Sequence, residues 1–292
     1  MKKLLLASTA LVALGGQALA ADLPVGMPVK APIAAPIPVF SWTGCYVGGH
    51  VGVGWGRKDF SEPTEPFGQN FAPVGSSINV DTGAGFLGGG QIGCDYQFAG
   101  NWVIGARGDF AWAHITGQSS DPFFAGKTIN SDGSPITLNA KTDALATVVG
   151  RLGYGWDRFM LYGTGGAAWA RDKYSITNLP FWGAGLNQAN FCANSTNTQV
   201  APCNPTGSET RLGWTVGVGF EWAIAGNWSL LVEFNHYDFG SRSVTLTALN
   251  GAGPGTVTIP LSGSVDIKQR IEAVKLGFNY RFGWDSAVAA RY

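Results

Sequence analysis

Ionisable residues recur at defined positions in stretches where bulky apolar residues alternate with small ones. There the apolar residues share one parity, and the ionisable residues share the other parity with glycine. Because successive side chains of a strand point to opposite faces, we expect these charges on one common face. A charge removed from water is costly unless opposite charges and hydrogen bonds compensate it. The set contains both signs: Asp95, Arg107, Asp109, Arg151, Glu221, Glu233, Lys275 and Arg281.

Two kinds of chemistry fit this set of charges. The first is a network of salt bridges and hydrogen bonds that fills a narrow interior. The second is a gated ion path, in which one pair exchanges partners and opens a thin file of water. A narrow interior favours the network, because it leaves little spare volume. The sequence does not assign partners, since these depend on the stagger of the strands.

The four cysteines form two candidate pairs. Cys192 and Cys203 lie about a dozen residues apart in one polar segment, where a disulfide would contribute about 3 kcal/mol in the chain-entropy model. Cys45 and Cys94 fall on the apolar parity, near the same end of two segments expected to be antiparallel neighbours. They are either a cross-strand disulfide or two separate small apolar side chains.

Three histidines, His50, His114 and His236, are the only imidazoles available for metal, heme or acid–base chemistry. No nucleophile motif stands beside His114 or His236, so the sequence predicts no enzyme. It also assigns no cofactor and no metal ligand. A serine or carboxylate within hydrogen-bonding distance of His114 or His236 would favour an enzyme instead.

The stretch RLGWTVGVGFEWAIAGNW, residues 211–228, shows most clearly which elements position these residues. Large apolar side chains occupy one parity, and glycine, threonine and glutamate occupy the other. A strand with so wide an apolar face needs an apolar partner, and a lipid bilayer is one. The letters Ala-Gly-Asn-Trp close this strand at 225–228 and recur at 99–102. The chain is therefore expected to repeat a membrane hairpin.

The same pattern predicts eight strands joined alternately by short turns and long polar loops. The strands are expected at 42–55, 86–98, 102–112, 145–156, 159–171, 211–224, 228–238 and 273–282. The long loops are expected at 57–82, 114–139, 172–209 and 239–264. Short turns on one side and long loops on the other are typical of outer-membrane barrels. The predicted fold is an all-β, transmembrane, eight-stranded antiparallel up-and-down barrel with long extracellular loops.

Composition and the N-terminal segment agree with this interpretation. Charged residues make up 13% of the chain, glycine and tryptophan are abundant, and the net charge of zero gives no reason to expect a nucleic-acid partner. Residues 1–20 have the basic, apolar and small-residue regions of a signal peptide. We expect a proline-rich periplasmic leader at 21–41, the barrel at 42–282, and at 283–292 either an extension or the end of the last strand.

Four motifs resemble one known family: WTGCYVGGHVGVGWG, GRLGYGWDRFMLYGTGGAAWA, EFNHYDFG and LGFNYRF. The chain is similar to the outer-membrane immunogenic, porin-family β-barrel proteins of α-proteobacteria over essentially its whole mature length. The resemblance implies an eight-stranded barrel in the outer membrane of a Gram-negative bacterium, with a structural and surface-antigen role. Some members of the family bind heme or have weak pore activity. The resemblance therefore also implies an alternative function, that of a narrow porin or of a heme-binding uptake protein.

The resemblance also implies the partners of the protein. These are outer-membrane lipid and lipopolysaccharide, the barrel assembly machinery, and an extracellular ligand or host contact through the loops. The chain departs from the family in two places. Cys45 and Cys94 stand where such proteins carry aromatic residues, and ten residues follow Phe282. The terminal aromatic residue that the assembly machinery reads is therefore either Phe282 or Tyr292.

Overall fold

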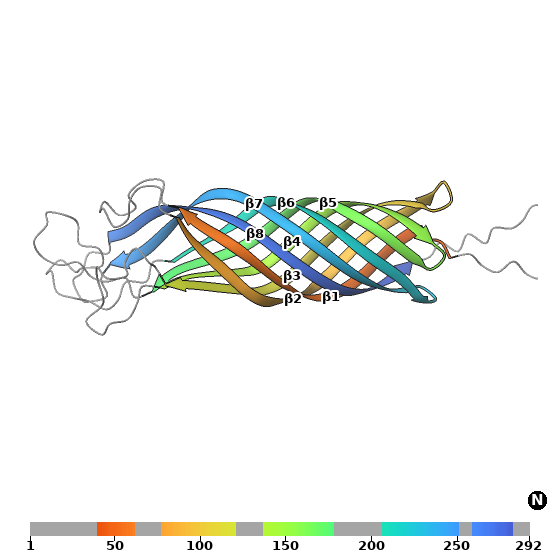
Figure 1. Cartoon of the computed structure of the whole chain (residues 1–292), viewed down its shortest axis with the longest axis horizontal. Coiled ribbons are helices and arrows are strands. Elements are labelled where there is room, and N and C mark those ends of the chain that lie inside the picture. Colours follow the sequence, from red (N-terminus) through yellow and green to blue (C-terminus); the bar gives the residue numbers. More distant parts are fainter. Residues whose placement is uncertain (1–39, 62–76, 121–136, 178–205, 251–258, 283–292) are drawn as a thin grey trace, which may run out of the picture. The chain divides into compact units, whose positions relative to one another are not determined.

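The computed structural model describes residues 40–61, 77–120, 137–177, 206–250 and 259–282, and every structural statement below concerns these ranges. They form one closed antiparallel barrel in which neighbours in sequence are neighbours in space and β1 pairs with β8 (Figure 1). Its strands are β1 (Gly44–Ser61), β2 (Ser77–Phe98), β3 (Trp102–Ser120), β4 (Thr137–Trp156), β5 (Phe159–Thr177), β6 (Thr206–Ala225), β7 (Trp228–Asn250) and β8 (Ile259–Phe282). The predicted fold class is confirmed.

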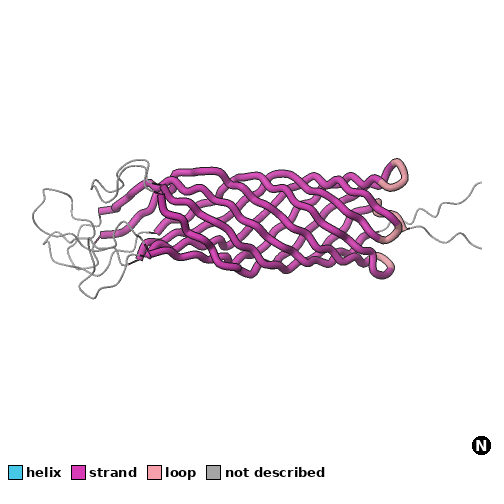
Figure 2. The backbone as a smooth tube through the Cα atoms, in the orientation of Figure 1, coloured by secondary structure: helices cyan, strands magenta, loops and turns pink. Residues whose placement is uncertain are grey.

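Three short turns, at 99–101, 157–158 and 226–227, lie together at one end of the barrel (Figure 2). Two of them place glycine at positive φ, +82° at Gly100 and +53° at Gly226, a conformation that costs glycine little. The described part of the chain contains no helix that is long and apolar enough to cross a membrane.

The outer wall carries a broad band of exposed apolar side chains, bounded by aromatic residues. Near the short turns the boundary includes Trp102, Trp156, Trp222 and Trp228. Farther along the strands, a second aromatic belt contains Trp55, Trp112, Trp169 and Trp214. Aromatic residues on both sides of an apolar band mark the two edges of the lipid that covers such a barrel.

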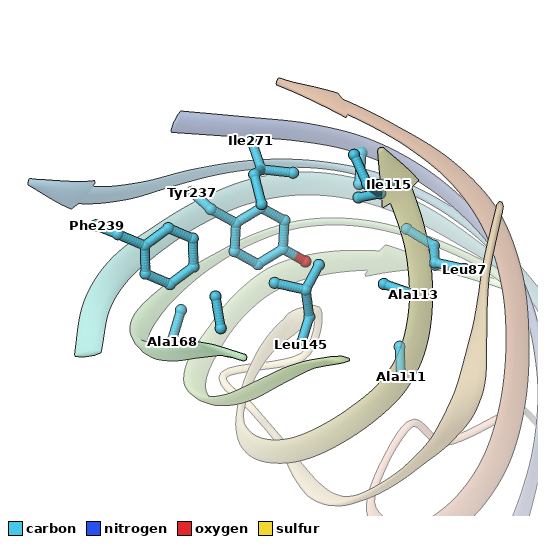
Figure 3. Packing of buried hydrophobic residues seen from close by; sticks show 11 residues of the cluster. Leu87, Ala111, Ala113, Ile115, Leu145, Ala168, Tyr237, Phe239 and Ile271 are labelled. Carbon is cyan, nitrogen blue, oxygen red and sulfur yellow. The ribbon is translucent and has the colours of Figure 1, made fainter. Parts of the chain in front are cut away.

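The interior of the barrel is filled by buried side chains in alternating apolar and polar layers. The apolar cluster nearest the short turns contains Trp42, Val103, Met160, Tyr162 and Ala223. A larger one lies at the level of the second belt, where neighbouring Tyr237, Phe239 and Ile271 project into the lumen together with Leu145 (Figure 3). The third, beyond the belt, contains Phe60, Val80, Leu138, Ala140, Tyr174, Val244, Leu246, Val265 and Ile267.

The strands extend well beyond the predicted boundaries, so the predicted loops were too long. Residues 57–61, 77–82, 114–120, 137–139, 172–177, 206–209, 239–250 and 259–264 belong to strands. The physical reason is that outward residues become polar and inward residues become apolar beyond the second belt, and that register shifts there change the inward parity of β2, β4 and β7. There Phe60 and Val80 face inward while Arg57 and Lys173 are exposed. A search for apolar residues on the outside therefore stops at the edge of the lipid.

Candidate functional site

Four of the predicted charges form a closed ring inside the barrel. Asp95, Arg151, Glu221 and Arg281 come from β2, β4, β6 and β8, every second strand. Asp95 accepts hydrogen bonds from Arg151 at 3.0 Å and from Arg281 at 2.9 Å. Glu221 pairs with Arg151, and its other oxygen lies 3.7 Å from Arg281. The signs alternate around the ring, so each charge has two opposite neighbours.

Neutral groups complete the coordination of this ring. Ser229 and Asn279 donate hydrogen bonds to Glu221 at 2.5 Å and 3.0 Å. Arg281 donates to the backbone oxygen of Trp42 at 2.6 Å, which holds the chain before β1 against the mouth of the barrel. The Arg151 guanidinium carbon stands 3.7 Å from the centre of the Tyr162 ring. Such contacts offset the desolvation that makes buried charges costly.

A second buried pair joins Arg107 on β3 to Glu233 on β7 across the lumen. Two parallel hydrogen bonds of 2.6 Å and 2.5 Å connect the guanidinium to the carboxylate. Tyr162 donates to Glu233 at 2.8 Å, and Asn235 donates to it at 2.9 Å. This bidentate geometry is the strong form of an ion pair between arginine and a carboxylate.

The third pair links Asp109 on β3 to Lys275 on β8. The Lys275 ammonium donates to the two Asp109 oxygens at 3.1 Å and 3.0 Å. Thr147 donates to Asp109 at 3.1 Å, and His50 Nε2 lies 3.3 Å from the same carboxylate. This group lies next to the apolar cluster at the second belt, on the side of the short turns. Ala273 belongs to that cluster and precedes Lys275 on the same face of β8.

The structure brings all eight sequence-predicted ionisable residues into the interior, and each contacts a group of opposite charge. Four are acidic and four are basic, so the set has no net charge. The sequence supplied the face of each residue but not its partner. It also missed the neutral groups that coordinate the charges, because serine, asparagine and tyrosine on an inward parity carry no charge signal.

A separate buried polar group beyond the second belt was missed altogether. Lys58 donates to Asp172 at 2.7 Å and to Thr142 at 3.2 Å, and Gln269 donates to Asp172 at 3.2 Å. Burial lowers the pKa of Lys58, and the Asp172 carboxylate partly opposes this. A signal did exist: Lys58 continues the inward parity of His50 on β1. Lys58 was missed because residues 57–82 were predicted to form a loop.

The structure places Cys45 and Cys94 directly opposite each other on β1 and β2. Their Cα atoms are 3.9 Å apart and their sulfur atoms are bonded. Both residues face outward near the short-turn end of the barrel. Cys192 and Cys203 lie outside the described residues, so their pairing stays a prediction.

His236 meets the condition that would favour an enzyme. Its Nδ1 lies 2.6 Å from Glu272, and its ring stands 5.5 Å from that of Trp214 on the outer wall. Among the described residues, Thr215 donates a hydrogen bond from its hydroxyl group to the backbone oxygen of His236 at 2.9 Å, but no hydroxyl or thiol group contacts the imidazole itself. No group of three or more metal-ligating side chains occurs there either. The His236 imidazole is therefore paired with a carboxylate, and the Thr215 hydroxyl group is engaged with the backbone of His236.

Comparisons with known proteins agree with this architecture. The family model described as "Outer membrane protein beta-barrel domain" matches residues 6–282. The 31 kDa outer-membrane immunogenic protein of Brucella melitensis biotype 1 is 33% identical over 285 residues, 97% of this chain and 100% of that protein. The 22 kDa outer membrane protein of Rhizobium leguminosarum bv. viciae is 27% identical over 245 residues, 84% of this chain and 80% of that protein.

Solved structures resemble the chain more distantly. The crystal structure of OprG from Pseudomonas aeruginosa is 12% identical in sequence and covers 82% of this chain and 96% of its own, with a TM-score of 0.44. With so low a TM-score, this likeness adds nothing to the family assignment.

Proposed function

The chain belongs to the outer-membrane β-barrel family, and from this premise we propose that it is a closed structural and antigenic protein of the bacterial envelope. It is an integral protein of the Gram-negative outer membrane, with relatives that are named outer-membrane immunogenic proteins. The role proposed for the interior is that of a plug that holds the wall together. The role proposed for the extracellular part is contact with molecules outside the cell.

The observation that carries the closed state is the apolar cluster at the level of the second belt. Leu87, Ile115, Tyr237 and Ala273 are each 0% exposed, so no water-sized sphere reaches these side chains. An ion crossing this level would lose its hydration without gaining a polar partner, which is strongly unfavourable. The narrow bore of an eight-stranded barrel leaves no second route around the cluster.

Conductance of the purified protein in planar bilayers tests this proposal. We expect no stable unit steps from the wild-type protein. A Tyr237→Ala/Phe239→Ala variant opens the apolar cluster and is the matched test for a latent path, because it removes no charged residue. Stable wild-type steps that disappear in Arg151→Gln or Glu221→Gln would overturn the plug and favour a narrow porin.

One observation favours heme binding as a second candidate function. An apolar concavity of about 850 Å³ lies on the outer wall, and its lining includes Phe86, Trp112 and His114. A histidine in an apolar site is a suitable ligand for heme iron. Titration with hemin tests it: a saturable shift of the Soret band that is lost in His114→Ala would support this function, and an identical titration of both proteins would reject it.

Absence of enzymatic activity is also part of the proposal, because the Thr215 hydroxyl group contacts the backbone oxygen of His236 and not its imidazole. The proposal also includes a signal peptide at 1–20 and a periplasmic leader at 21–41. The assembly signal is proposed to end at Phe282, since the family match ends there. Phe282→Ala should then impair insertion by the barrel assembly machinery, whereas deletion of 283–292 should not.

A further inference from the structure

A polar concavity lies beyond the second belt, and most of its lining residues, which come from β3 to β7, face outward. Its volume is about 880 Å³. Gly117 and Gly207, which have no side chains, are part of its lining. The outward residues around them carry amide or hydroxyl groups, namely Gln118, Asn139, Ser175, Ser208 and Thr245. Amide and hydroxyl groups both donate and accept hydrogen bonds, as the hydroxyl groups of a sugar do.

Two lysines line the same concavity. Lys141 and Lys173 are register partners on β4 and β5. Like charges directly opposite each other in a sheet are unfavourable, so this pair needs an anionic partner. Asp143 supplies part of it, with oxygens 3.1 Å from Lys141 and 2.5 Å from Lys173. One carboxylate between two ammonium groups leaves a net positive charge.

The lysines remain able to bind a ligand. Their side chains are 40% and 52% exposed, whereas that of Asp143 is 18% exposed. Each ammonium has three donors, and the contacts with Asp143 do not use all of them. The hydrogen bond from Lys173 holds the pKa of Asp143 below its ordinary value, so the carboxylate stays ionised at neutral pH and keeps both lysines in place.

The position of the concavity identifies what faces it. Lys173 lies four residues beyond Trp169 on the same face of β5. With a rise of about 3.3 Å per residue and a tilted strand, this is about 10 Å above the aromatic belt. The belt marks the edge of the apolar part of the membrane. The concavity therefore faces the headgroup layer of the outer leaflet, which consists of sugars that carry phosphate and carboxylate groups.

We propose that this concavity binds the anionic sugar core of the lipopolysaccharide that surrounds the barrel. Lys141 and Lys173 contact phosphate or carboxylate groups, which an ammonium binds as a point charge. The amide and hydroxyl side chains contact sugar hydroxyls. The proposal rests on the proposed function in one respect, since it requires the short turns to face the periplasm.

Binding by the full-length folded protein in nanodiscs tests the site. The probes are lipopolysaccharide with a phosphorylated core, lipid A without core sugars, and soluble heparin fragments as an acidic glycan from another source. We expect Lys141→Gln/Lys173→Gln to weaken binding of the core-bearing lipopolysaccharide by about tenfold or more while leaving lipid A binding unchanged. The matched control, Arg242→Gln/Lys268→Gln, removes the same charge from exposed residues on β7 and β8.

A second variant separates shape from charge. Ser208→Trp fills the concavity without changing its charge, and it should produce a similar loss. Equal losses in the control variant would indicate general attraction to an anionic surface and overturn the site, as would unchanged binding in Lys141→Gln/Lys173→Gln. Tighter binding of heparin fragments than of lipopolysaccharide would overturn the membrane source. Conductance of the wild-type protein would overturn the closed barrel but would leave these binding results intact.

Discussion

The membrane-embedded part and the extracellular part of this barrel are built on opposite patterns. Between the two aromatic belts, apolar side chains face outward and charges face inward, as Val218 and Glu221 do on β6. Beyond the second belt, apolar side chains such as Phe60 face inward and polar ones such as Arg57 face outward. The strands continue through both regions, although the pairing register shifts near the second belt between several neighbours, among them β2 and β3 and also β7 and β8. On β1 and β5, where the same parity faces inward in both regions, the surroundings decide which face is apolar.

The difference shows where the stability of each part originates. Lipid is as apolar as a leucine side chain, so the embedded part gains little by burying apolar groups and depends on its ion pairs and backbone hydrogen bonds. Water surrounds the extracellular part, where burial of Phe60, Val80 and Tyr174 supplies the hydrophobic effect. Substitutions of charged residues should therefore affect the first part most, and substitutions of apolar residues the second.

The largest effect is expected from Arg151→Met in the embedded part. It leaves Arg281 as the one charged partner of Asp95, and the only charged partner left to Glu221 is the same arginine at 3.7 Å. Removing one member of a buried ion pair costs about 4 kcal/mol, because the remaining charge is uncompensated. Urea unfolding of the protein in lipid vesicles measures the loss.

The double variant Arg151→Met/Glu221→Gln is the control for this substitution. It removes one charge of each sign, and the amide oxygen that replaces the carboxylate still accepts the hydrogen bonds from Ser229 and Asn279. Most of the lost stability should return. If the double variant is as unstable as the single one, the ring does not act through charge balance.

The eight inward charges could be predicted from the sequence because lipid makes the alternation unmistakable. Glu221, for example, lies between outward Phe220 and Trp222. Lys58 and Asp172 could not be predicted in the same way, since outward polar and inward apolar residues near them look like a polar loop. The pairing of Arg107 with Glu233 across the lumen depends on the shear of the barrel, which no local pattern contains.

A somewhat smaller effect is expected from Phe60→Ala in the extracellular part. Phe60 is 4% exposed and makes an edge-to-face contact with Tyr174 at 5.9 Å. Loss of a buried phenylalanine costs about 3 kcal/mol. Hydrogen exchange should become faster in strand segments beyond the second belt and stay unchanged between the belts. Val218→Ala, on the lipid-facing wall, is the control and should change neither region. Faster exchange in both regions would show that they unfold as one unit.

The smallest effect on stability is expected from removing the cysteine pair. This pair lies in the embedded part, but it does not interact with the charged residues there. Cys45 and Cys94 are 49 residues apart in the sequence, so a disulfide shortens the unfolded chain. Cys45→Ser/Cys94→Ser should destabilise the barrel by about 2 kcal/mol, below the chain-entropy value, because the unfolded chain in a bilayer is already restricted. Mass spectrometry before and after reduction establishes whether the bond is present. Two free thiols at these positions in the native protein would show that no disulfide contributes to the stability of the barrel. If the bond is present, its loss should shift the unfolding of both regions equally, because it constrains the unfolded chain and not the packing of either region.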